Sequence, residues 1–133
     1  MKRVIIAIVF IVTSIVTGIY STNETDNRCN RMESRINSAI KLNTEILENN
    51  NHNKRIEFYN TTKSLNDAWE ENSRFFYFFF NNDDIKDIET NIEKLPEHAK
   101  NGDLESAYLC LVECLEEFVY LKNNTRLTFN NMF

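Results

Sequence analysis

The feature that most constrains this chain is an uncharged, apolar segment at its N-terminus. Lys2 and Arg3 precede a run from Val4 to Tyr20 that carries no charge and is mostly isoleucine and valine. At about 17 residues, it lies at the lower limit for crossing a ~30 Å hydrocarbon core and slightly exceeds the apolar part of most cleaved signal peptides. The segment is therefore predicted to be either a membrane anchor or a signal sequence.

The residues that end this segment favour an uncleaved anchor. Thr17, Gly18 and Ile19 do not form a clean small-x-small cleavage site, and Cys29 lacks the small and aliphatic residues that precede a lipoprotein cysteine. Basic residues ahead of a span keep the N-terminus in the cytoplasm. We predict a single-pass transmembrane helix (signal anchor) over residues 1–22, which holds the protein in the cell membrane. Residues 23–133 are then expected outside the cytoplasm. Cleavage would instead give a secreted protein.

The composition of the remaining chain favours helices. Gly18 and Gly102 are the only glycines and Pro96 is the only proline, so the tight turns of an all-β protein are missing. The 133 residues, 42% hydrophobic and 26% charged, fit one globular unit plus the apolar segment. Runs of asparagine such as Asn49 to Asn51 indicate AT-rich codons and favour a bacterial source.

Apolar residues then recur every three or four positions in four segments. The first two predict helices over about residues 24–48, continuous with the membrane span, and over about residues 54–80. In the second half, Asp83 or Asp84 can cap a third helix, which Pro96 should kink or end early.

A fourth helix is expected after Gly102, because glycine commonly closes the preceding helix. A short tail, Thr125 to Phe133, follows it. We therefore predict an all-α fold, in which the membrane helix leads into an antiparallel helical bundle of two αα-hairpins.

Several features across nearly the whole chain form a recognisable pattern. They are the basic start with its isoleucine-rich span, Trp69, the stretch Asp83 to Glu89, the helix from Leu111 to Lys122 and the ending Leu127 to Phe133. In these helices and spacings the chain resembles the DUF4363 family of Firmicutes, whose function is unknown. The resemblance implies a small membrane-anchored helical protein and leaves the chemistry open. Two positions depart from the family pattern. Members often carry a histidine in place of Asn82, and they usually continue the third helix where Pro96 stands.

The charge balance argues against several partners and sites. Without Lys2 and Arg3, 13 basic and 20 acidic side chains remain, a net charge of −7, and no Lys/Arg cluster is present for nucleic acid or anionic lipid. The acidic residues within 83–89 suit a helix N-terminus and lack the ligand spacing of a calcium loop. Those within 113–117 have no paired nucleophile and favour a solvated face.

The cysteines and histidines form no complete chemical motif. Cys110 and Cys114 lie four residues apart within an apolar stripe, which favours core packing over a metal or redox pair. His52 and His98 fall near turns, far from these cysteines in sequence, so no zinc motif is complete. A disulfide between Cys29 and Cys114 is left open. We predict that the protein is not an enzyme and has no metal or cofactor.

An aromatic run is the most unusual feature outside the apolar segment. Six consecutive rings surround a helix on every side, so a four-helix core cannot bury them all. The first helix should rise roughly 40 Å from the membrane and the second descend about as far, which returns this run to the bilayer surface. We predict a membrane or partner interface formed by Phe75, Phe76, Tyr77, Phe78, Phe79, Phe80, Phe129, Met132 and Phe133. The alternative is a thick end of the core followed by a tail.

Two classes of function are compatible with these features. The first is a membrane-anchored, extracytoplasmic, non-catalytic interaction or accessory subunit, whose partner is an integral membrane protein. The second is a secreted or anchored sensor or ligand-binding bundle, in which a small apolar molecule lies between the helices. A cavity among Trp69, Phe76, Ile88 and Leu111 would support the second class, and a filled core would count against it.

Overall fold

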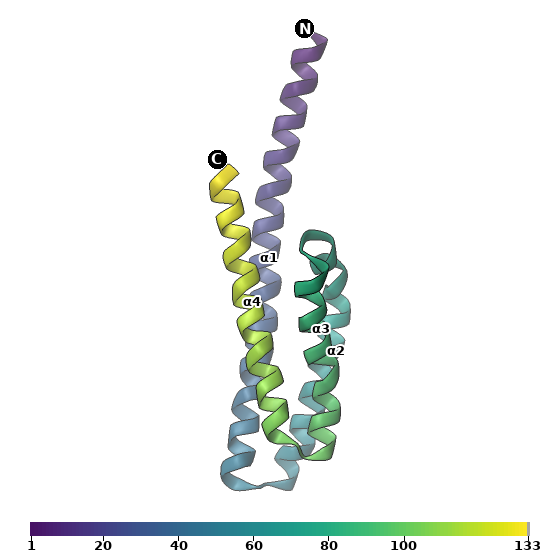
Figure 1. Ribbon diagram of the computed structural model, residues 1–133, viewed down its shortest axis with the longest axis vertical. Helices are drawn as coiled ribbons and strands as arrows, with labels where there is room; N and C mark the ends of the chain where they lie inside the picture. The colour runs from purple at the N-terminus through teal and green to yellow at the C-terminus, as the bar shows by residue number, and fades with distance from the viewer. Residues whose placement is uncertain (133) are drawn as a thin grey trace.

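The computed structural model describes the backbone of residues 1–132 and the side chains of residues 1–125. Within this part of the chain, four helices follow one another: α1 (Lys2–Asn49), α2 (His52–Phe79), α3 (Asn82–Asn101) and α4 (Leu104–Met132). Neighbouring helices run in opposite directions as two hairpins (Figure 1). The predicted all-α bundle is confirmed.

Helix α1 continues from the apolar segment into the bundle without a break, as predicted. It has 48 residues, and at 1.5 Å per residue it is roughly 70 Å long. Its first buried residue is Thr25. Its N-terminal part projects alone beyond the other helices (Figure 1). The packed bundle therefore begins close to Thr25.

Asparagine side chains cap the N-termini of α2 and α3. The Oδ1 atom of Asn51 accepts a hydrogen bond from the N–H of Asn53 at 2.9 Å, and that of Asn81 accepts one from the N–H of Asp83 at 3.1 Å. These bonds satisfy N–H groups that have no partner within the helix. Asp83 and Asp84, which we expected at the cap, instead lie in the first turn of α3, where negative charge suits the helix dipole.

Helix α3 continues through Pro96, contrary to the early end that this proline suggested. Proline removes one backbone hydrogen bond of the helix. Ile92 and Leu95, on the preceding turn, are fully buried, and their packing offsets that loss. The helix ends at Gly102, whose φ of 73° lies in the left-handed region that glycine adopts without strain.

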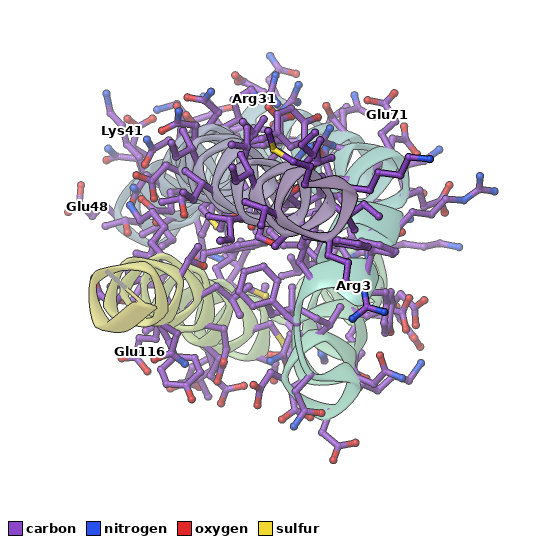
Figure 2. All side chains as sticks on the ribbon, turned by 90° about the horizontal axis from the view of Figure 1, so that it is seen from above. Arg3, Arg31, Lys41, Glu48, Glu71 and Glu116 are labelled. Carbon is purple, nitrogen blue, oxygen red and sulfur yellow. The ribbon has the colours of Figure 1, made fainter. Side chains whose placement is uncertain are left out.

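The core fills the centre of a ring of helices. Helix α1 packs against α2 and α4, and α3 packs against the same two helices from the opposite corner. Charged side chains point away from this centre, as Arg31, Lys41, Glu71 and Glu116 do in Figure 2. The largest fully buried side chains are Trp69, Phe58, Phe76, Phe118, Met32 and Ile36.

The segment for which we predicted a short tail is helical as far as Met132. The apolar spacing weakens near Thr125, but an existing helix extends at the cost of fixing only one residue for each new hydrogen bond. Helix α4 therefore passes the turn between α2 and α3 and continues beside α1 (Figure 1).

Candidate membrane-facing surface

The N-terminal part of α1 leaves its apolar side chains uncovered. Eleven of these side chains are between 45% and 70% exposed: Val4, Ile5, Ile6, Ile8, Val9, Phe10, Ile11, Val12, Val16, Ile19 and Tyr20. The most apolar 18 residues of α1 have a mean hydropathy of 2.4. By length and composition, this helix is long and apolar enough to cross a membrane. A soluble protein rarely exposes so large a contiguous apolar surface, and this segment is compatible with a single-pass membrane anchor or with a signal sequence.

Hydroxyl groups within this segment are satisfied by the helix itself. Thr13 donates to the carbonyl oxygen of Val9, Ser14 to that of Phe10, and Thr17 to that of Thr13, each at 2.8 Å. A polar group in hydrocarbon is tolerated when such a bond replaces water. These three side chains therefore do not conflict with a lipid environment.

The aromatic run divides between the core and the surface. Phe76 is fully buried, whereas Phe78 is 81% exposed. The other four rings, Phe75, Tyr77, Phe79 and Phe80, are partly buried. The prediction that the core cannot bury every ring holds for Phe78 most clearly.

Two contacts place the aromatic run beside the end of the apolar segment. Arg28 Nη1 donates to Asn72 Oδ1 at 2.8 Å, and the Arg28 guanidinium lies 4.6 Å from the centre of the Phe75 ring. Because the two helices are antiparallel, the last residues of α2 lie beside approximately residue 21 of α1. The rings of Phe78 and Phe79 therefore stand at the level where the uncharged segment ends. Sequence reasoning did not find the role of Arg28, since the contact joins residues 44 positions apart.

Below this level, stacked rings fill the centre of the bundle. The Trp69 ring stacks on Phe76 with 5.7 Å between centroids, and Phe118 contacts both, at 6.2 Å from Trp69 and 5.6 Å from Phe76. Ile88 and Leu111, the other residues of the proposed ligand cavity, are fully buried. This packing counts against an apolar ligand between the helices.

A groove of about 610 Å³ lies instead at the surface between α1 and α2, with polar residues such as Ser34, Ser38 and Ser64 in its wall.

A carboxylate links α2 to α3 just below the aromatic end. The Tyr77 hydroxyl donates to Glu89 Oε2 at 2.8 Å, and Lys86 Nζ donates to the same oxygen at 2.6 Å. The hydrogen bond from Lys86, followed by the one from Tyr77, lowers the pKa of Glu89 below its usual 4.5. The ionised carboxylate therefore holds the two helices together.

Acidic side chains gather along the groove between α3 and α4. This groove has a volume of about 330 Å³ and includes Asp87, Glu113, Glu116 and Glu117 in its wall. Burial raises the pKa of Glu117, and the negative charges of Asp84 and Asp87 raise it further. In the part of the chain that the structure describes, no group of three or more His, Cys, Asp or Glu side chains could hold a metal ion.

The cysteines lie inside the bundle as free thiols, so the disulfide between Cys29 and Cys114 that we left open is not formed. Burial raises the pKa of Cys29 to about 12, with a smaller contribution from the charge of Glu33. Burial likewise raises the pKa of Cys110 and Cys114. A thiol in this state is protonated and packs as a small apolar group, as the sequence suggested.

The remaining residues of the predicted interface are Phe129, Met132 and Phe133. The backbone of Phe129 and Met132 belongs to α4. Their side chains, and the whole of Phe133, lie outside the described residues.

Sequence reasoning missed apolar side chains on the outer face of α4. Leu109 is 57% exposed, Val119 42% and Tyr120 49%. A second apolar spacing along this helix, through Val112 and Leu115, could have revealed that α4 is apolar on more than its core side.

One family model matches this chain. It is described as Domain of unknown function (DUF4363), and the match covers residues 19–132. No curated protein matches the chain, and no solved structure does.

Proposed function

We propose that this chain, which belongs to the DUF4363 family, is a single-pass membrane protein that serves as a non-catalytic accessory subunit of an integral membrane protein. The bundle, from about residue 23 onward, stands outside the cytoplasm. The basic residues Lys2 and Arg3 hold the N-terminus inside.

One observation carries this proposal: a bare apolar helix continues directly into a packed bundle. The first buried residue of α1 is Thr25, and the residues before it have no cover comparable to that of the core. Since α1 has no break, the bundle is held upright on the membrane at a fixed distance. A flexible linker would leave the height and orientation of the bundle free, whereas a continuous helix presents the same surfaces to a neighbour in the membrane.

The state of the reactive side chains supports a non-catalytic role. The cysteine thiols are buried and protonated, so they are poor nucleophiles. The Glu89 carboxylate is occupied by Tyr77 and Lys86. His98 lies 3.5 Å from Asp103 at the end of the bundle far from the apolar segment, where it closes the turn between α3 and α4.

The aromatic end of α2 is the surface we assign to the partner or to the head groups around it. Phe78 is 81% exposed at the level where α1 leaves the apolar region. Aromatic rings are favoured at a membrane interface, where one side meets hydrocarbon and the other meets water. An exposed ring in this place is therefore suited to contact a neighbouring transmembrane protein.

Site-specific photo-crosslinking in intact cells tests the partner. A photoreactive phenylalanine analogue is placed at Phe78, and a matched control carries it at Leu47, which is 61% exposed at the opposite end of the bundle. We expect the probe at Phe78, and not the one at Leu47, to crosslink to an integral membrane protein. Equal crosslinking from both positions would contradict the assignment.

The anchor is tested on the same cells. We expect full-length protein that resists alkaline extraction from membranes, and an Ile8→Arg variant that no longer resists it, because a charge at the centre of a span is costly. Protein recovered in the medium, alone and shorter by about twenty residues, would show a cleaved signal peptide and overturn the proposal.

A further inference from the structure

Helix α4 extends farther toward the membrane than the turn between α2 and α3 does. Asn43 Nδ2 donates to the carbonyl oxygen of Leu104 at 3.0 Å, which places the start of α4 beside residue 43 of α1. Counting upward in antiparallel register, Met132 falls beside approximately residue 15, whereas the end of α2 falls beside approximately residue 21. The difference of six residues corresponds to roughly 9 Å. Figure 1 shows the same overhang of α4 alongside α1.

A seam of polar contacts fixes this register immediately below the overhang. Lys122 Nζ donates to Asn30 Oδ1 at 3.0 Å and to Glu33 Oε2 at 2.9 Å. The side chains of Lys122 and Glu33 are only 16% and 17% exposed, so the pair is well shielded from water. Helix α4 therefore cannot slide along α1 without breaking a largely buried ion pair.

One face of the apolar segment differs from the others. Ile15, Gly18, Ser21 and Thr22 are partly buried, whereas neighbours such as Val16 and Tyr20 are 60% and 59% exposed. The partly buried positions recur at three- and four-residue spacing and continue the stripe that reaches the fully buried Thr25. The face of α1 that packs in the bundle thus continues into the apolar segment, where α4 is the helix beside it (Figure 1).

The end of the chain has a composition suited to the polar head-group layer. From Asn123 to Phe133, Arg126 is the only charged side chain, and four asparagines and two threonines are interspersed with Leu127, Phe129 and Met132. By its register, Arg126 lies beside approximately residue 21 of α1, at the level where head groups are expected. An arginine at that height can bind a lipid phosphate while the residues after it stay uncharged.

We propose that the last turns of α4, residues 125–132, lie beside α1 in the outer head-group layer and reach its boundary with the acyl chains. The carboxyl end of the chain is then a second lipid-contacting element. This inference rests on the proposed membrane anchoring, because α1 sets the height of the bundle. The depth stays within the interface, where the unpaired carbonyls at the end of α4 remain hydrated.

Depth-dependent fluorescence quenching tests the proposal on the full chain, reconstituted in phosphatidylcholine vesicles. A thiol-reactive fluorophore is attached to Phe129→Cys or Asn131→Cys, two positions roughly 200° apart around the helix, so that one points away from α1. Phe78→Cys reports the aromatic end of α2, and Lys100→Cys is the control at the far end of the bundle. The native cysteines are buried and should not react, which labelling of the unsubstituted chain verifies.

We expect iodide in the water to quench the probe at position 129 or 131 severalfold less than at Lys100→Cys, and less than at Phe78→Cys. Lipids with a nitroxide near the glycerol backbone should quench it most. If both α4 probes are as accessible to iodide as Lys100→Cys while Phe78→Cys is protected, the overhang stands in water and the inference is wrong. Protection from both iodide and nitroxide lipid would indicate a second copy in place of lipid and also overturn it. If the chain does not float with the vesicles, the proposed anchoring itself fails.

Discussion

The structure predicts that two neighbouring phenylalanines contribute very differently to stability. Phe76 is fully buried and lies 5.7 Å from Trp69 and 5.6 Å from Phe118, whereas Phe78 is 81% exposed. Phe76→Ala loses the transfer energy of a buried ring, about 2–3 kcal/mol, and the ring–ring contacts, about 1 kcal/mol, and it leaves a cavity. We therefore expect the free energy of unfolding to fall by roughly 3–5 kcal/mol.

Phe78→Ala is the matched control, because it makes the same chemical change two residues away. Only about a fifth of its ring is covered, so the expected loss is roughly 0.5 kcal/mol. Both variants are measured by urea titration of the full chain in mild detergent micelles. Fluorescence of Trp69, the single tryptophan, follows the core, and far-ultraviolet circular dichroism follows the helices independently.

The expected losses of the two variants are well separated. The loss for Phe76→Ala is a large share of the about 5–15 kcal/mol by which native domains are stable. An equal loss in the two variants, or a loss below about 1 kcal/mol for Phe76→Ala, would refute the division of the aromatic run between core and surface. It would also remove the basis for assigning Phe78 to a partner or to head groups.

Three other substitutions test the contacts between helices. Tyr77→Phe removes the hydrogen bond to Glu89 and should cost about 1 kcal/mol at neutral pH. Because the folded-state pKa of Glu89 is lowered, this contribution is present above pH 4.5 and should disappear as the pH falls further, which unfolding titrations at several pH values would show. Glu117→Gln should raise the free energy of unfolding by about 0.5 kcal/mol at pH 7, since it removes a partly buried charge among other acids. That gain should shrink in acid, where the raised pKa of Glu117 lets it bind a proton more readily in the folded state; a constant gain would argue against the electrostatic cause. Asn43→Ala removes the bond to Leu104 from the core and should cost about 1–3 kcal/mol in a thermal melt followed by circular dichroism. An unchanged melting temperature would mean that this bond does not stabilise the start of α4.

The sequence alone was enough to predict the helical architecture. The apolar segment, the three- and four-residue spacing of residues such as Ile36 and Ile92, and Gly102 at a helix end all act through local geometry or through the exclusion of apolar groups from water. Such signals are readable without knowing which helix packs on which. The resemblance to the DUF4363 family was likewise visible in the residues and was confirmed by the family match.

Local signals failed where packing between distant segments decides the outcome. Pro96 suggested a kink or an early helix end, and the early end is wrong, because the buried side chains around it hold α3 together. The segment after Thr125 gave little apolar spacing, yet it continues as a helix beside α1. In both places the deciding neighbour lies far away in sequence.

The division of the aromatic run belongs to the same category. From sequence, the six rings from Phe75 to Phe80 are equivalent candidates for an interface, since each is aromatic and adjacent to the others. Only the tertiary structure distinguishes Phe76, enclosed by Trp69 and Phe118, from Phe78, which is 81% exposed. Composition determines how much apolar surface a helix carries, whereas the positions of the other helices determine which part of that surface is covered. What remains uncovered on α1 and α2 is the surface that is available for contacts outside the bundle.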